Sequence, residues 1–206
     1  MKDVKTKPKN GPWGRLQSKG QKRAFTEEQV QLIRANLEMQ KTYPGHRGAI
    51  REVALLETAL STCLRSSDLL ALRVSEVLAG GRIVDKIPVK QKKTGKVILV
   101  PLRERARLAL MAWIQQDGLV NNVRLFDFSR QYYGDIVKTW ARMVHADPRT
   151  YSTHSMRRTH PTHVYLKTHN AAAASRMLGH DDLAQTIHYL SVGVTEAHKL
   201  AEEHEI

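Results

Sequence analysis

The sequence has little cysteine, no long apolar run and a shortage of acidic residues. Its single cysteine, Cys63, excludes an internal disulfide and suits a reducing compartment, where it is most simply a small buried residue. No apolar run approaches the roughly 20 residues that a membrane-spanning helix needs. The amino terminus also lacks the apolar core of a signal peptide. We therefore expect a cytoplasmic protein that does not attach to a membrane.

The shortage of acidic residues leaves a strong positive charge. Lys and Arg number 33 against 20 Asp and Glu, which gives a formal net charge of +13 and a pI of about 10.0. This balance predicts a polyanionic partner, with nucleic acid ahead of an acidic membrane surface. A chain of 206 residues can form one main domain with a small appendage.

The first 23 residues are rich in lysine and arginine and hold two prolines and three glycines. Such a polar segment buries too little surface to offset the entropy lost on ordering. We expect residues 1–23 to form a flexible basic arm that follows a nucleic-acid backbone on binding. The alternative is a solvated tail without that role.

Helices dominate the expected secondary structure. Thr26 and Gln29 have capping-box spacing ahead of apolar residues at helical intervals. Further helices are expected at residues 50–60, 69–77, 104–116, 131–145, 155–167 and 171–178, with shorter ones near 183 and 195. Two β runs, 83–89 and 97–100, flank a basic hairpin tip that contains a glycine. The predicted fold class is mainly α with a small antiparallel β-sheet (α+β).

The last quarter of the sequence concentrates groups that can hold a phosphodiester and attack it. A tyrosine such as Tyr189 has a pKa of about 10, so its ionisation at pH 7 costs roughly 4 kcal/mol without help from neighbours. Arg157 can neutralise phosphate oxygens, and His154 and His180 can move protons or donate hydrogen bonds. The alternative for Tyr189 is an ordinary core aromatic residue.

A second arginine and a general acid would complete such a site. Arg65 lies at the junction of two apolar segments, and Asp68 could orient its guanidinium. Arg73 is the rival, although its position favours a surface role. The hairpin tip offers three lysines of equivalent chemistry, which are Lys92, Lys93 and Lys96.

Five features follow one another along the chain. They are Arg65 within Leu-Arg-Ser-Ser-Asp-Leu-Leu, the Lys93-Thr94-Gly95 hairpin, His154 three residues before Arg157, Leu178-Gly179-His180, and Tyr189 nine residues after His180. In this order they resemble the catalytic domain of tyrosine recombinases, the phage integrase family, over residues 24–191. The resemblance implies the tyrosine recombinase catalytic-domain fold.

The resemblance also implies a role for each residue. Tyr189 would be the nucleophile, and Arg65 and Arg157 would clamp the phosphate. Lys93 would be the general acid, while His154 and His180 would transfer protons and bind phosphate. No cofactor or metal is implied, because the bond energy is kept in a covalent 3′-phosphotyrosyl link.

The implied function is site-specific recombination of double-stranded DNA by integration, inversion or excision, in the bacterial cytoplasm or nucleoid. The implied assembly is a homotetramer on paired sites. Residues 192–206 have apolar residues at near-helical spacing and could form a helix that protomers exchange, the alternative being a terminal helix that packs on its own domain. Because only a short basic arm precedes the catalytic unit, the chain resembles the minimal recombinases that switch fimbrial promoters, and a host DNA-bending protein could assist. The alternatives are a type IB topoisomerase-like enzyme and an inactive DNA-binding regulator.

Several residues carry further expectations. Of the adjacent Arg157 and Arg158, one should face solvent, and the family register makes that residue Arg158. His160 and His163 have zinc-like spacing but no cysteine or carboxylate nearby, which favours capping and packing. Pro161 removes a backbone hydrogen bond inside an expected helix, so a bend there could shift His154 and Arg157.

Overall fold

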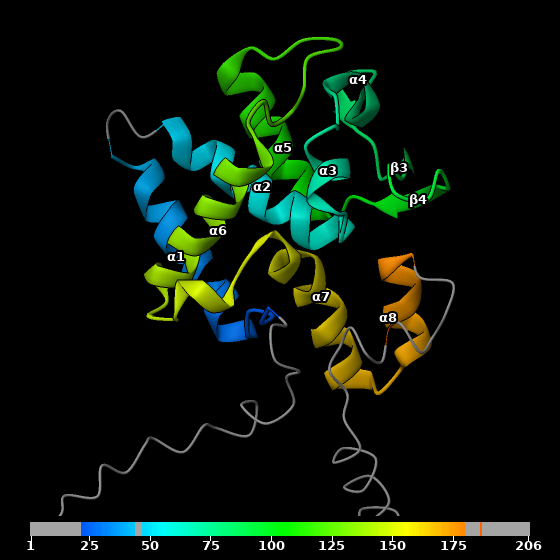
Figure 1. The fold of residues 1–206 in the computed structure, drawn as a ribbon. Coiled ribbons are helices and arrows are strands. Elements are labelled where there is room, and N and C mark those ends of the chain that lie inside the picture. The colour runs from blue at the N-terminus through cyan, green and yellow to red at the C-terminus, as the bar shows by residue number, and fades with distance from the viewer. Residues whose placement is uncertain (1–21, 44–46, 180–185, 187–206) are drawn as a thin grey trace, which may run out of the picture.

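The structure is a computed structural model that describes residues 22–43, 47–179 and 186 (Figure 1). Its elements in chain order are α1 (Glu27–Lys41), α2 (Arg47–Thr62), α3 (Ser66–Leu69), α4 (Val74–Val77), β1 (Leu78–Ala79), β2 (Arg82–Ile83), β3 (Lys86–Lys90), β4 (Val97–Pro101), α5 (Glu104–Asp117), α6 (Arg130–Met143), the 3-10 helix η2 (Pro148–Thr150), α7 (Thr153–Thr168) and α8 (Ala171–Leu178). The predicted mainly helical fold with a little antiparallel β structure is confirmed. Within the described ranges, no helix combines the length and apolar character that crossing a membrane requires.

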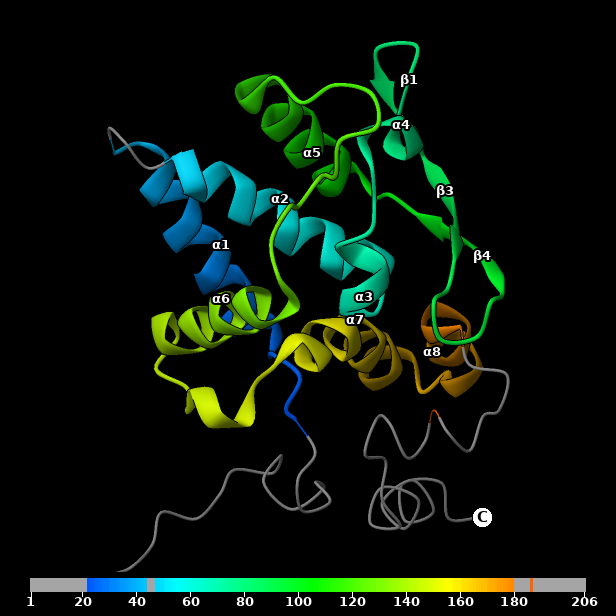
Figure 2. The ribbon, with the colours of Figure 1, turned by 45° about the horizontal axis from the view of Figure 1, so that its top comes forward.

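The helix α2 lies at the centre of the helical body and packs against α1, α5 and α7 (Figures 1 and 2). Every residue from 53 to 64 is buried. Its buried carboxylate, Glu57, accepts two hydrogen bonds from Arg34 at 2.5 and 2.9 Å, which satisfies the charge. The helix therefore forms a fixed base for the segment that follows it.

The first helix begins where its capping pattern predicts. The Gln29 amide donates to Thr26 Oγ1 at 3.2 Å, and the Thr26 amide donates to Gln29 Oε1 at 3.0 Å. Val30, Ile33 and Leu37 are buried along one face of α1. Local sequence alone is sufficient to define this element, because both partners in the cap lie three residues apart.

Two predictions for residues 69–90 are wrong in detail. The expected helix 69–77 is split into α3 and α4, because Arg73 is extended and pairs with Arg124 of a distant loop. The expected strand 83–89 is also interrupted, so the described residues form two two-stranded sheets, β1–β2 and β3–β4, and not one. Apolar spacing does not reveal the pairing of Arg73 with a remote segment, which sets the first break. The second break separates β2, which pairs with the adjacent β1, from β3, which pairs with β4.

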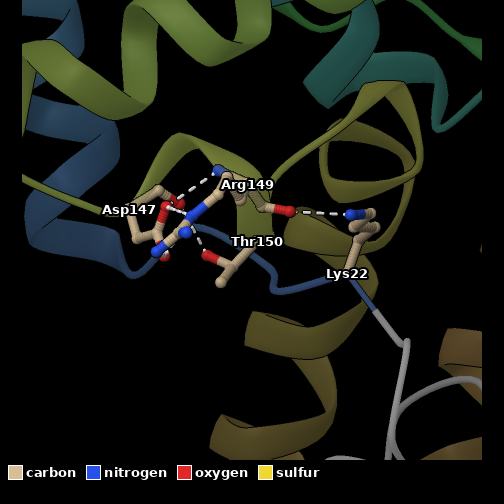
Figure 3. Close-up of polar contacts among 4 residues, drawn as sticks. All are labelled: Lys22, Asp147, Arg149 and Thr150. Atoms are coloured by element: carbon tan, nitrogen blue, oxygen red, sulfur yellow. Dashed lines mark hydrogen bonds and ion pairs between the residues drawn. The ribbon is translucent and has the colours of Figure 1, made fainter.

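Residues 22–25 form an N-terminal strap that lies against η2. Lys22 Nζ donates to the Arg149 carbonyl at 2.7 Å (Figure 3). The Arg23 amide donates to the Thr150 carbonyl at 2.9 Å. Lys22 and Arg23, which the sequence placed in the basic arm, therefore belong to the folded domain.

The strap also covers the middle of α7. The Phe25 ring is buried and stacks on Tyr151 at a centroid distance of 4.3 Å, and its amide donates to Thr159 Oγ1 at 3.1 Å. Arg158 donates to the Lys22 carbonyl at 2.6 Å and is only 4% exposed. The prediction that Arg158 faces solvent is wrong, because the strap closes over it.

The helix α7 continues through Pro161, which is buried in its interior. A proline leaves the carbonyl four residues earlier, here that of Arg157, without its usual amide donor. The structure nevertheless assigns one helix from Thr153 to Thr168, so His154 and Arg157 share its first half. The proline therefore does not break the helix that carries both residues.

Candidate active site

The segment after α2 begins with a residue in the left-handed region. Cys63 has a φ of +52°, which a glycine adopts at less cost, and its carbonyl accepts a hydrogen bond from Arg157 Nη1 at 2.6 Å. Burial raises the pKa of the Cys63 thiol to about 12, so the thiol stays protonated at neutral pH. The expectation of a small buried residue at this position is confirmed.

Arg65 and Arg73, the two candidates for the second arginine of the site, have different surroundings. Arg65 is the N-cap residue of α3, and its Nη1 is buried without a hydrogen-bond partner in the described part of the chain. Arg73 is engaged elsewhere, because its guanidinium donates to the Asn122 carbonyl. Arg65 therefore offers a free donor beside α7, and Arg73 does not.

Asp68 does not orient Arg65, contrary to the sequence-based expectation. No ion pair joins these two described side chains. Asp68 is buried, and its Oδ1 accepts from the Lys92 amide at 3.0 Å and from Ser67 Oγ at 3.2 Å. The carboxylate thus anchors the β3–β4 hairpin to the segment that contains Arg65.

The amino end of α7 presents His154 and Arg157 on one side of the helix. Ser152 and Ser155 form a capping box, and the His154 amide donates to Ser152 Oγ at 3.2 Å. Residues three apart in a helix are neighbours on its surface. The cap therefore fixes where the helix begins, and helical geometry makes His154 and Arg157 neighbours on its surface.

Arg157 joins three separate segments. It is 3% exposed, donates from Nη1 to the Cys63 carbonyl after α2, and donates from Nη2 to the Leu178 carbonyl at the end of α8. Figure 2 shows α3 and α8 close to α7. Arg157 therefore holds together the segment of Arg65, the helix that carries His154 and the residues that precede His180.

The surroundings of His154 favour a neutral ring. Although the residue is exposed overall, partial burial lowers its pKa below the ordinary value, and the charges of Arg157 and Arg65 lower it further. Arg130 and Arg158 act in the same direction. The site is therefore a cluster of arginines beside an imidazole that is neutral at pH 7.

Lys93 lies in the turn between β3 and β4, where Gly95 has a φ of +70°. Lys92, Lys93 and Lys96 are all exposed. The backbone of Lys92 is fixed by Asp68, and Thr94 Oγ1 donates to Gln91 Oε1 at 2.7 Å. Lys93 thus lies between Lys92 and Thr94, which are both held by hydrogen bonds.

Two predicted site residues, His180 and Tyr189, lie outside the described residues. His180 follows Gly179 directly in the sequence, and Gly179 ends α8 with a φ of +61°. The structure therefore brings together Arg65, His154 and Arg157, with the Lys93 hairpin anchored beside Arg65. The roles of all six residues remain predictions.

His160 and His163 form polar contacts that hold the fold together. His160 Nδ1 lies 3.0 Å from the Leu60 carbonyl and 2.9 Å from Arg103 Nη1. His163 Nε2 lies 2.7 Å from the Phe25 carbonyl. Across the described ranges there is no group of three or more His, Cys, Asp or Glu residues suited to a metal ion.

Sequence reasoning missed two residues near the site. Arg130 begins α6 and acts on the pKa of His154, although the two lie 24 positions apart in the sequence. Gln91 is buried at the base of the Lys93 turn. An isolated arginine and an isolated glutamine carry no local pattern, so only the tertiary arrangement identifies them.

Replacing Arg65 by alanine should raise the pKa of His154. The substitution removes a positive charge that disfavours the imidazolium, so the pKa should move toward its ordinary value of about 6.5. An NMR titration of the histidine rings, with His154→Gln to assign the resonance, measures the change. Arg149→Ala is the matched control, because Arg149 is exposed and pairs with Asp147. An unchanged pKa in Arg65→Ala would contradict the proposed clustering.

Comparison with known sequences agrees with this arrangement. The model of the phage integrase family matches residues 23–196. Tyrosine recombinase XerD of Chlamydia pneumoniae is 30% identical over 193 residues, which cover 87% of this chain and 59% of that protein. XerD of Brucella suis is 30% identical over 186 residues, with coverages of 84% and 59%. The chain thus spans 59% of the length of these two relatives.

Solved structures of low identity share the fold. The XerA recombinase aligns with a TM-score of 0.67 at 17% identity, over 92% of this chain and 66% of that chain. XerH recombinase in its post-cleavage DNA complex gives a TM-score of 0.68 at 19% identity, over 87% and 52%. The catalytic domain of bacteriophage HP1 integrase aligns with a TM-score of 0.57 at 18% identity, over 90% of this chain and 96% of that chain. The chain belongs to the phage integrase family, and its described residues have the fold of a tyrosine recombinase catalytic domain.

Proposed function

We propose that this protein is a site-specific DNA recombinase that cleaves and rejoins strands through a 3′-phosphotyrosyl intermediate. The observation that carries the proposal is the arginine cluster, in which Arg157 is buried and Arg65 has an unpartnered Nη1 beside a neutral His154. Guanidinium groups bind phosphate oxygens in a fixed geometry. The XerH structure is described as a post-cleavage complex of a site-specific recombinase bound to a palindromic difH substrate, which supports a DNA substrate for this chain.

The proposed reaction uses the residues as follows. The Tyr189 oxygen attacks phosphorus while its phenol proton passes to a histidine of the site, and the bond from phosphorus to the 5′-oxygen breaks. Arg65 and Arg157 neutralise the charge that develops on the phosphate oxygens. Lys93 gives its proton to the leaving 5′-oxygen, while His154 and His180 donate hydrogen bonds or move protons.

The free 5′-hydroxyl can then attack the phosphotyrosyl link and rejoin the strands. Because the link conserves the energy of the original phosphodiester, the proposed cycle consumes no ATP. Fixed cations also stabilise the transition state, and this stabilisation offsets the free-energy cost of using a phenol with a pKa of about 10 as the nucleophile.

Tyr189→Phe should abolish the covalent adduct with DNA, because the variant lacks the attacking oxygen. The measurement uses nicked suicide duplexes made from the DNA that flanks the gene, with adducts resolved on a denaturing gel. Wild-type protein should yield a band that migrates with the mass of protein plus a DNA strand. Tyr165→Phe is the matched control, since Tyr165 is a buried residue of α7 outside the proposed site.

A wild-type protein that forms no adduct would refute catalysis and favour a DNA-binding regulator. Relaxation of supercoiled DNA without recombination at any paired sites would favour a topoisomerase-like enzyme. Adduct formation by Tyr189→Phe would show that another residue is the nucleophile.

We further propose that four protomers act on two DNA sites, and that a host DNA-bending protein assists. A cavity of about 490 Å³ lies between α1, α2, α5 and α7. Its lining includes apolar residues such as Val30 and Leu60 and charged residues of both signs, among them Arg105 and Glu104. Residues 192–206 hold apolar positions at near-helical spacing and four glutamates. We propose that this segment docks, through its apolar positions, in the cavity of a neighbouring protomer.

Removal of residues 192–206 should reduce recombination at least about tenfold while DNA affinity changes less than about threefold, because the proposed contact joins protomers and not DNA. A paired-site recombination assay and a gel-shift titration measure the two effects. Leu200→Asp in the full chain should show the same separation, and Lys199→Ala should not. Normal recombination by the truncated protein would contradict the docking proposal.

A further inference from the structure

The turn that carries Lys93 is closed by Gln91. The Gln91 amide donates to the Lys96 carbonyl at 2.8 Å, and its carbonyl accepts from the Gly95 amide at 2.8 Å. The side-chain Oε1 accepts from Thr94 Oγ1 at 2.7 Å. Gln91 thus makes three contacts across a turn whose other described residues are exposed, while it is itself only 1% exposed.

The same side chain packs against the end of α8. A β-carbon built on Gly179 would lie 3.0 Å from Gln91 Nε2 and 3.7 Å from Ile98 Cδ1. The close approach favours glycine at this position, which also has a φ of +61°. Figure 2 shows the β3–β4 turn beside α8. The turn is held against the residue that directly precedes His180 in the sequence.

Burial of this glutamine needs an explanation. A buried amide costs free energy unless its hydrogen bonds are made, and Gln91 Nε2 has no partner in the described part of the chain. An apolar residue would fill the same space at the base of the hairpin without that cost. An apolar residue would, however, lose the hydrogen bond that Gln91 Oε1 accepts from Thr94 Oγ1, next to Lys93.

A second anchor lies on the other side of Lys93. The Lys92 amide donates to Asp68 Oδ1 at 3.0 Å, and Asp68 lies three residues after Arg65. Lys93 therefore lies between Lys92, which is bound to the Arg65 segment, and Thr94, which is linked through Gln91 to the end of α8. These two anchors restrict the backbone of Lys93 and leave its exposed side chain to extend from a defined point.

We propose that Gln91 is a positioning residue that places Lys93 for proton donation to the leaving 5′-oxygen. The inference rests on the proposed function. Gln91 does not touch the DNA or the reacting atoms, and it acts by locking the turn through Thr94 and by seating it on Gly179. Misplacement of a catalytic group by about 1 Å can cost roughly 100-fold in rate.

The chemistry of the leaving group separates this role from general damage to the fold. An alcohol leaves poorly as an anion, since its pKa is near that of water at about 15.7, and it gains from a proton given by Lys93. A thiol has a pKa of about 8.5 and can leave as a thiolate. A DNA strand with sulfur in place of the scissile 5′-bridging oxygen should not need the proton.

The experiment compares single-turnover cleavage of oxygen and sulfur suicide duplexes by the full chain. Gln91→Leu should cleave the oxygen substrate about 10- to 100-fold more slowly than wild type, and the sulfur substrate within about threefold of wild type. Lys93→Ala should show the same pattern with a larger loss on oxygen, because general acids contribute roughly 10²- to 10⁴-fold.

Two further variants complete the comparison. Thr94→Val removes the donor to Gln91 Oε1 and the longer contact, 3.4 Å, that Thr94 Oγ1 accepts from the Lys96 amide. It should give a smaller loss that sulfur also rescues, and it tests the lock even where Gln91→Leu does not fold. Leu99→Ala is the matched control, because Leu99 is 63% exposed on the same hairpin. It should cleave both substrates at wild-type rates.

Equal losses on both substrates in the Gln91 and Thr94 variants would overturn the proposal, as would full activity on oxygen. Wild-type protein that cleaves neither substrate would instead contradict the proposed function itself. Rescue by sulfur that is confined to the Gln91, Thr94 and Lys93 variants would support the positioning role.

Discussion

The buried guanidinium of Arg157 is the interaction on which the arrangement of the site depends. It donates to the Cys63 carbonyl after α2 and to the Leu178 carbonyl at the end of α8. These two segments are separated in sequence by more than half of the chain. A buried cation is costly unless its hydrogen bonds are satisfied. The two carbonyl groups that accept hydrogen bonds from Arg157 belong to the segments that carry Arg65 and that precede His180. The same hydrogen bonds therefore fix the positions of those segments.

A second layer of polar contacts fixes the parts that Arg157 does not reach. Asp68 and Gln91 hold the β3–β4 turn from two sides, and the N-terminal strap covers α7 from the outside through Arg158 and Phe25. Each contact joins an element of the site to a different part of the fold. These contacts hold the described candidate-site residues in one arrangement, which electrostatic stabilisation of a developing charge requires.

Much of this could be predicted from local sequence. The Thr26 capping box, the position of Arg65 after a buried helix and the three-residue spacing of His154 and Arg157 depend on neighbours within one or two turns. Three of the errors share one cause, which is a partner far along the chain. Asp68 binds Lys92, 24 residues away, and Arg158 binds Lys22, 136 residues away. Arg73 pairs with Arg124 and interrupts an apolar pattern that alone predicts a longer helix.

The identity of the residue that carries DNA tests the account most directly. Wild-type protein trapped on a suicide duplex would be digested with nuclease and protease, and the modified peptide identified by mass spectrometry. The account predicts a nucleotide joined through its 3′-phosphate to Tyr189. A nucleotide on any other residue, or one joined through a 5′-phosphate, would contradict it.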